Sequence, residues 1–72
     1  MGVTLSIDVE READGRWLAE VPELPGVLAY GVTEAEAVAR AEALALRVFA
    51  ERLEHGEADA LVSLAFTRAA AA

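Results

Sequence analysis

Hydrophobic and polar residues alternate strictly through residues 3–10. The odd-numbered positions carry apolar side chains, namely Val3, Leu5, Ile7 and Val9. The even-numbered positions carry polar ones, namely Thr4, Ser6, Asp8 and Glu10. This period of two predicts a β-strand with one buried face and one face open to water.

A second strand is predicted at residues 17–21, because Asp14-Gly15 before it favours a tight hairpin turn with positive φ. Pro22 and Pro25 follow, and each lacks a backbone N–H. The segment 22–26 is therefore predicted to be a loop rather than the interior of a strand. Beyond it, a third strand at 27–30 completes an antiparallel meander.

A long helix is predicted from about Glu34 to Glu54. Thr33 and Glu36 form a capping box, in which the threonine hydroxyl accepts from the Glu36 amide and the Glu36 carboxylate reaches back. Gly56 ends the helix near His55. One apolar stripe faces the sheet, formed by Ala37, Val38, Ala41, Leu44, Ala45 and Val48.

A final strand is predicted at 60–67, with Val62, Leu64 and Phe66 on one face. The element order is then βββαβ, an α+β fold. A right-handed crossover through the helix places the last strand parallel to the first, at the open side of the meander. The helix covers one face of the sheet and leaves the other free. We expect one domain over 1–72, with an ordered core at 3–67 and a frayed tail at 69–72.

Three apolar residues widen the helix stripe beyond what one small sheet can cover: Leu46, Phe49 and Leu53. Either a second copy buries them or they wrap over the edge of the sheet. We favour the second copy, because a 72-residue domain without cysteine has no disulfide to stabilise it. A homodimer or higher homo-oligomer is therefore predicted, with these three residues as candidates for its interface.

The chain has 13 acidic and 6 basic residues, a net charge of -7. Nucleic-acid binding depends on neutralising phosphates with Lys and Arg, so we expect no direct binding to nucleic acid. An acidic domain favours basic partners, although negative charge also serves solubility alone. No apolar run approaches the roughly 20 residues of a membrane span, and no secretory signal is evident, so a cytoplasmic location is predicted.

All six basic residues are arginine, and Lys, Asn, Gln and Cys are absent. The loss of thermolabile Asn, Gln and Cys is typical of a thermophile. The missing lysine and abundant alanine are equally typical of GC-rich coding.

Residues 14–26 carry a resemblance to a known family, together with positions that follow them. The quoted run is Asp14-Gly15-Arg16-Trp17-Leu18-Ala19-Glu20-Val21-Pro22-Glu23-Leu24-Pro25-Gly26, followed by Gly31, Thr33 and Glu36-Ala37-Val38. This pattern resembles the HicB-like antitoxin family, whose members share a D-G-hydrophobic-x-A-x-V-P-E-L-P-G core and a capped T-x-x-E-A helix. The resemblance covers residues 3–67.

The resemblance implies a partial ribonuclease-H-like βββαβ domain. In HicA–HicB pairs such a domain covers a small, basic toxin that cleaves messenger RNA, and carboxylates complement the basic surface of that toxin. Many HicB proteins continue into a DNA-binding domain, whereas this chain ends at Ala72, so we expect no DNA-binding domain here. The loop of the family often continues Pro-Gly-Cys, and this chain has Val27 at that position.

Two candidate chemistries compete with a binding role. Asp8 and Glu10 lie on the first strand where a metal-dependent nuclease would hold carboxylates, but the last strand adds none. His55 has the side chain of a general base, yet its place at the helix end favours an interaction with the last carbonyls. We therefore expect no enzyme activity, no catalytic residue, no cofactor and no metal.

The remaining candidates are residues that would contact a partner. Trp17 is either an interface anchor or a side chain packed over the sheet. Turn chemistry accounts for both prolines and Gly26, but it does not account for Glu23 and Leu24. The sequence thus predicts a toxin-binding antitoxin domain, or alternatively an orphan oligomeric domain, with five partner-binding candidates: Asp8, Glu10, Trp17, Glu23 and Leu24.

Overall fold

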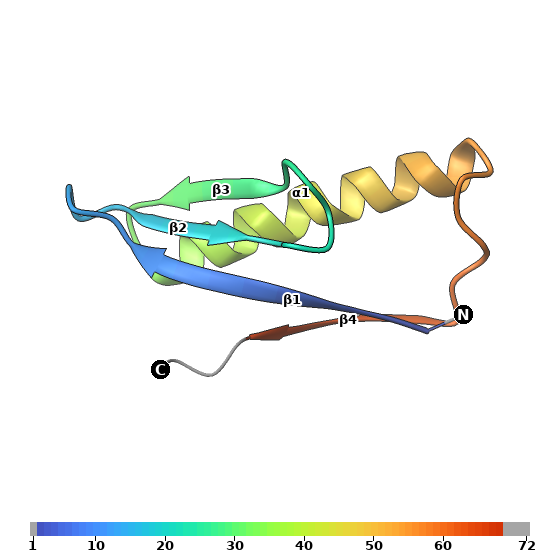
Figure 1. Cartoon of the computed structure of the whole chain (residues 1–72), viewed down its shortest axis with the longest axis horizontal. Helices are drawn as coiled ribbons and strands as arrows, with labels where there is room; N and C mark the ends of the chain where they lie inside the picture. Colours follow the sequence, from blue (N-terminus) through green and yellow to red (C-terminus); the bar gives the residue numbers. More distant parts are fainter. Residues whose placement is uncertain (1, 69–72) are drawn as a thin grey trace.

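The computed structural model describes residues 2–68, which form four strands and one long helix (Figure 1). The elements are β1 (Gly2–Arg11), β2 (Trp17–Glu20), β3 (Leu28–Gly31), α1 (Glu34–Glu54) and β4 (Ser63–Arg68). The frayed tail predicted at 69–72 lies outside the described residues.

The four strands form one mixed sheet in the order β3-β2-β1-β4. β1 and β2 pair antiparallel, as do β2 and β3, while β1 and β4 run parallel. The predicted α+β arrangement, with the last strand beside and parallel to the first, is confirmed. β4 begins at Ser63 rather than at 60, so Val62 precedes the ladder and is 86% exposed instead of facing the core.

The hairpin between β1 and β2 closes around three residues, 13–15. The Gly15 amide donates to the Glu12 carbonyl over 2.9 Å, and the Glu12 amide donates to the Arg16 carbonyl over 2.7 Å. Gly15 has φ 91°, and Asp14 does not share this positive φ. The loop is thus a turn followed by a left-handed glycine, a common three-residue hairpin connection. The Arg16 amide, and then its guanidinium, hold the pKa of Asp14 below its ordinary value.

The loop between β2 and β3 consists of two consecutive β-turns. The Leu24 amide donates to the Val21 carbonyl, and the Val27 amide donates to the Leu24 carbonyl, each over 3.0 Å. Each proline occupies the second position of its turn, and Gly26 (φ 86°) follows Pro25 as type II geometry requires. The residues that begin and end the two turns, Val21, Leu24 and Val27, are all buried in the core.

The helix begins and ends as the sequence predicts. The Thr33 hydroxyl accepts from the Glu36 amide over 3.1 Å. The Glu36 carboxylate accepts from the Val32 amide over 3.0 Å, one residue earlier than the predicted capping box places it. In the described part of the chain, no helix has the length and apolar character that a membrane crossing requires.

The core lies between α1 and the sheet and is built from small side chains. Its buried residues are Leu5, Ile7, Ala19, Val21, Leu24, Val27, Ala37, Ala41, Ala45 and Phe49. Phe49 is only 8% exposed, so the chain itself covers this residue, contrary to its prediction as an oligomer contact. Helical periodicity turns Phe49 inward beside Ala45, whereas Leu46 and Leu53 remain 49% and 36% exposed.

Candidate interaction surface

One face of the sheet is covered by α1, and the opposite face, here called the open face, carries no helix (Figure 1). The strand register shows which side chains share it. They are Thr4, Ser6, Asp8, Glu10, Leu18, Glu20, Leu28, Tyr30, Ser63, Ala65 and Thr67. The sequence predicts the β1 members of this face, and their assignment to the uncovered side is confirmed.

Three exposed carboxylates gather where β1 and β2 pair on the open face. Asp8 lies directly opposite Glu20, and Glu10 follows on the same face. None of the three forms an ion pair with any residue that the structure describes. Like charges directly opposite on neighbouring strands destabilise a sheet. Within the described residues, no ion pair offsets the repulsion between Asp8 and Glu20.

Apolar side chains lie beside these acids on β2 and β3. Leu18 is opposite Tyr30, and Glu20 is opposite Leu28. Tyr30 is 38% exposed and Leu28 is 42% exposed. The open face thus combines an acidic half on β1 and β2 with an apolar half on β2 and β3. Aromatic residues such as Tyr30 are enriched in protein-binding surfaces.

A shallow hollow of about 180 Å³ borders Tyr30 at the β3 margin. The Arg16 guanidinium lies 4.5 Å from the centroid of the Tyr30 ring, and Arg16 also pairs with Asp14 over 2.8 Å. Arg40 donates to the Tyr30 carbonyl over 3.1 Å and lies 3.4 Å from Glu36. Both arginines are held by the chain's own acids and by the tyrosine, which keeps positive charge fixed at one end of an acidic surface.

Glu23 joins the loop to β1. Its carboxylate accepts from the Ser6 amide over 3.0 and 3.1 Å and from the Ser6 hydroxyl over 2.7 Å. These bonds replace the ladder beyond the end of β2, where Pro22 turns the chain away. The Ser6 hydroxyl in particular holds the pKa of Glu23 below its ordinary value. Glu23 therefore has a structural role that turn chemistry alone does not reveal.

Two other predicted partner-binding residues lie away from the open face. Leu24 is 3% exposed and belongs to the core, so its prediction as a contact residue is wrong. It points inward because it is shared by the two turns. Trp17 lies on the helix side of the sheet, half-buried against the core, with the Arg11 guanidinium 5.7 Å from its ring centroid. Its packing interpretation therefore holds, and it does not adjoin Asp8 and Glu10.

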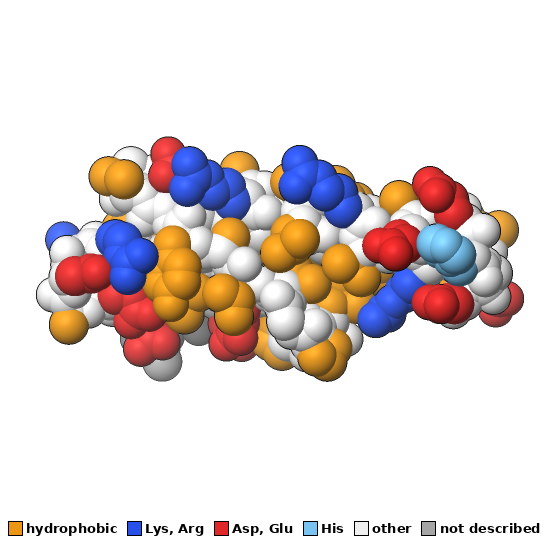
Figure 2. Space-filling view, turned by 90° about the horizontal axis from the view of Figure 1, so that it is seen from above, with side chains coloured by type: hydrophobic (Ala, Val, Ile, Leu, Met, Phe, Trp, Pro, Cys, Tyr) orange, Lys and Arg blue, Asp and Glu red, His pale blue; other side chains and the backbone are white. Residues whose placement is uncertain are grey.

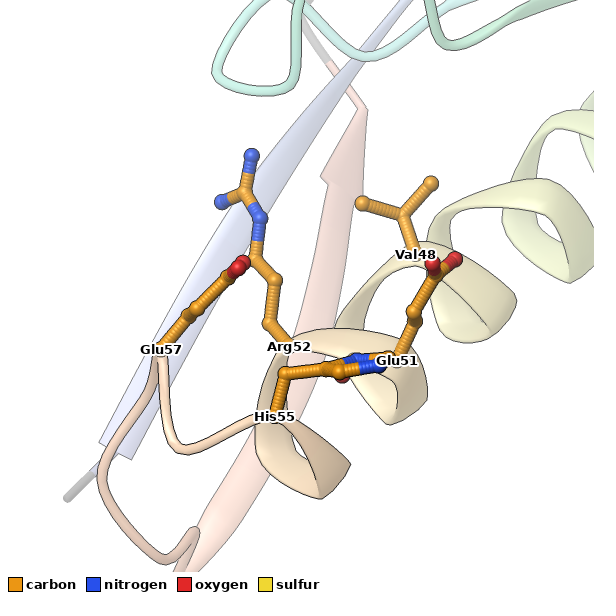
Figure 3. A pocket seen from close by; sticks show the side chains of 5 residues that line it. All are labelled: Val48, Glu51, Arg52, His55 and Glu57. Carbon is orange, nitrogen blue, oxygen red and sulfur yellow. The ribbon is translucent and has the colours of Figure 1, made fainter.

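His55 closes α1 and lines a hollow of about 270 Å³ with Val48, Glu51, Arg52 and Glu57 (Figure 3). Its Nδ1 lies 2.8 Å from the Glu51 carbonyl, so the ring satisfies the last turn of the helix as predicted. The lining residues include no hydroxyl or thiol that a base would activate. Seen from above, the histidine and neighbouring carboxylates occupy one end of the molecule, apart from the apolar side chains at its middle (Figure 2).

Asp8 and Glu10 do not assemble a recognisable metal centre with other side chains. Within residues 2–68, no group of three or more His, Cys, Asp or Glu side chains is placed to hold a metal ion. Sequence reasoning missed Glu20 and Leu28 as members of the surface. The signal for both is the register of the hairpin, since a loop centred on residue 14 places residue 20 opposite residue 8.

Comparison with models of protein families, with curated proteins and with solved structures finds no match to this chain.

Proposed function

We propose that the protein is an antitoxin-type interaction domain whose open face binds and neutralises a small, basic, RNA-cleaving toxin. The observation that carries this proposal is the unpaired acidic group on the open face, formed by Asp8, Glu10 and Glu20. The HicB-like pattern in residues 14–38 supports the same class of partner.

The electrostatics of the open face favour a basic protein as its occupant. Asp8 and Glu20 repel each other in the free chain, and an arginine or lysine from a partner placed between them relieves that repulsion. The net charge of -7 adds long-range attraction, which raises the association rate. Tyr30 and Leu28 supply the apolar contact that charge alone does not provide.

The proposal predicts a small basic protein encoded beside this chain's gene, and it is tested by measuring that protein's cleavage of a labelled RNA. We expect equimolar antitoxin to suppress cleavage. The double variant D8N/E20Q should inhibit about tenfold less well, a change equivalent to about 1.4 kcal/mol in binding. The matched control E57Q/D59N removes the same two charges away from the open face and should inhibit as the wild type does. Undiminished cleavage at molar excess of the wild type would refute the toxin role.

The alternative is an orphan domain whose only partner is another copy of itself. Leu46 and Leu53 on α1 favour this alternative, because both are apolar and remain 49% and 36% exposed. Absence of a small basic reading frame beside the gene, together with a dimer in solution, would select it over the toxin-binding role.

A further inference from the structure

The outer edge of β4 is an unpaired strand edge. Within residues 2–68, the backbone groups of β4 that face away from β1 hydrogen-bond to no other part of the chain. At the opposite margin, Arg40 donates to the Tyr30 carbonyl and Glu36 accepts from the Val32 amide. An open row of backbone donors and acceptors is a template for pairing with another strand.

The apolar side chains of β4 are also incompletely covered. α1 packs chiefly over β2 and β3, and β4 lies at the other side of the sheet (Figure 1). Leu64 and Phe66 are consequently only half-buried on the helix side. Just before the strand, Val62 is 86% exposed. The unpaired edge is therefore bordered by apolar surface.

Two leucines of α1 extend the exposed apolar surface of the molecule. Arg40 reaches β3, so its flank of α1 turns toward the β3 margin and the flank across the buried stripe turns away from it. At 100° per residue along the helix, Leu46 and Leu53 lie on the flank of α1 opposite to that of Arg40, here called the β4 flank. They are 49% and 36% exposed.

The distribution of charge indicates what covers this edge. From Ala60 to Ala72 the sequence contains no acidic residue, and Arg68 is the one charged residue in that stretch. The acids of the sheet lie instead on the open face at β1 and β2. A basic partner is attracted to those acids rather than to β4. Two copies that each carry a net charge of -7 repel each other, and this repulsion is weaker at a strand that itself carries no acid, as β4 does.

We propose that β4 pairs antiparallel with β4 of a second copy, around a two-fold axis near Ala65. The axis is perpendicular to the sheet, so the two sheets become one and both helices lie on the same face. Arg68 of each copy then comes opposite Val62 of the other, and the flanks bearing Leu46 and Leu53 face each other above the joined strands. The open face remains free in this dimer, so the inference does not depend on the proposed toxin-binding role.

The first test is the mass in solution, measured by light scattering over a range of protein concentrations. We expect a dimer of the 7.6 kDa chain. Ala65→Glu places two carboxylates across the axis and should weaken dimerisation at least about tenfold. Ala43→Glu adds the same charge on the exposed helix surface and should leave the dimer intact. A wild-type monomer at all concentrations, or dissociation by Ala43→Glu and not by Ala65→Glu, would overturn the proposal.

The second test uses single cysteines, because the wild-type chain has none. Side chains directly opposite across an antiparallel pair approach within about 4.5–5.5 Å, near enough for a disulfide after small adjustment. Oxidised Ala65→Cys should run as a covalent dimer on a denaturing gel, because the two copies of position 65 lie opposite each other at the axis. Thr67→Cys, which comes opposite Ser63 of the second copy, and Ala43→Cys should both remain monomeric. This readout holds even if Ala65→Glu fails to fold. Crosslinking at position 43 or 67 but not at position 65, or at none of the three positions, would contradict this pairing of β4.

Discussion

At the β3 margin of the sheet the helix packs over the strand, and its side chains hold backbone groups at the strand edge. At the β4 margin the strand lies beyond the helix, and its outer edge has no partner in the described chain. The two margins have similar backbone conformations but different surroundings. A single helix packed over a four-stranded sheet thus protects one edge of the sheet and leaves the other edge available for pairing with another strand.

The largest expected difference between the margins concerns two phenylalanines. Phe49 of α1 is 8% exposed, and Phe66 of β4 is half-buried. Phe49→Ala should lower the free energy of unfolding by about 3 kcal/mol, because it leaves a cavity in the core. Phe66→Ala should cost about 1 kcal/mol at low protein concentration, where the chain is monomeric. Urea unfolding measures both values.

Repeating these measurements over a range of protein concentrations separates the two phenylalanines further. If β4 forms the dimer interface, the cost of Phe66→Ala should rise with concentration while that of Phe49→Ala changes less. Equal costs for the two variants at low concentration would show that Phe66 is covered as fully as Phe49.

The next largest expected difference in stability is between alanine substitutions at two glycines, one beside each margin. A Cβ added at Gly31 would lie 2.5 Å from the Ala37 amide nitrogen and 3.0 Å from its Cα, which are backbone atoms that cannot rotate away. Gly31→Ala should therefore destabilise the protein by about 2 kcal/mol. A Cβ at Gly2 meets only the Ser63 hydroxyl at 3.2 Å, and that side chain can turn. Gly2→Ala should change stability by less than about 0.5 kcal/mol. Thermal unfolding of both variants tests this, and similar losses would contradict a tight β3 margin.

The bond between Glu23 and Ser6 gives a pH-dependent difference in the middle of the sheet. Because hydrogen bonds from Ser6 lower the pKa of Glu23 in the folded state, its stabilisation is complete above the unfolded pKa and is lost as the pH falls through the folded one. Glu23→Gln should thus be less stable than the wild type at pH 7. The difference should shrink as the pH falls below about 4.3, the usual pKa of a glutamate.

Ser6→Ala provides the matched control for this pH series. It removes the hydroxyl donor but keeps the amide donor. Its stability difference from the wild type should therefore shrink toward acid pH in the same way, but it should be smaller than that of Glu23→Gln. Unfolding midpoints of the wild type and both variants, measured from pH 3 to 7, test this pH dependence. A difference between wild type and Glu23→Gln that grows toward acid pH would refute this role for Glu23.

The sequence predicts the elements and their order because periodicity, capping and turn residues are local signals. Thr33 and Gly56 mark the helix ends, and the alternation in β1 marks its buried face. The make-up of the open face depends instead on one detail of the hairpin. A two-residue turn at Asp14-Gly15 would place Asp8 opposite Val21, whereas the three-residue loop places it opposite Glu20. Such a one-residue slip moves every side chain of β2 to the other face.

Leu24 and Glu23 show a second limit of sequence reasoning. Their roles depend on tertiary contacts, since Leu24 is buried beneath the sheet and Glu23 bonds to Ser6, 17 residues away. Local turn chemistry accounts for neither contact. Phe49 differs from Leu46 and Leu53 for the same reason, because the exact tilt of the helix decides which side of the apolar arc is covered.

The smallest expected effect concerns Arg40, which closes the β3 edge. Its exposed pairing with Glu36 and its bond to the Tyr30 carbonyl contribute less than about 1 kcal/mol together, because both are accessible to water and screened by salt. Arg40→Ala should therefore barely change unfolding, but it frees the Tyr30 carbonyl as a second docking edge. In the Ala65→Glu background it should restore weak, concentration-dependent association that Arg47→Ala does not, because Arg47 touches no strand edge in the described chain. Light scattering that finds the two double variants equally monomeric would show that the helix, rather than Arg40, keeps the β3 margin closed.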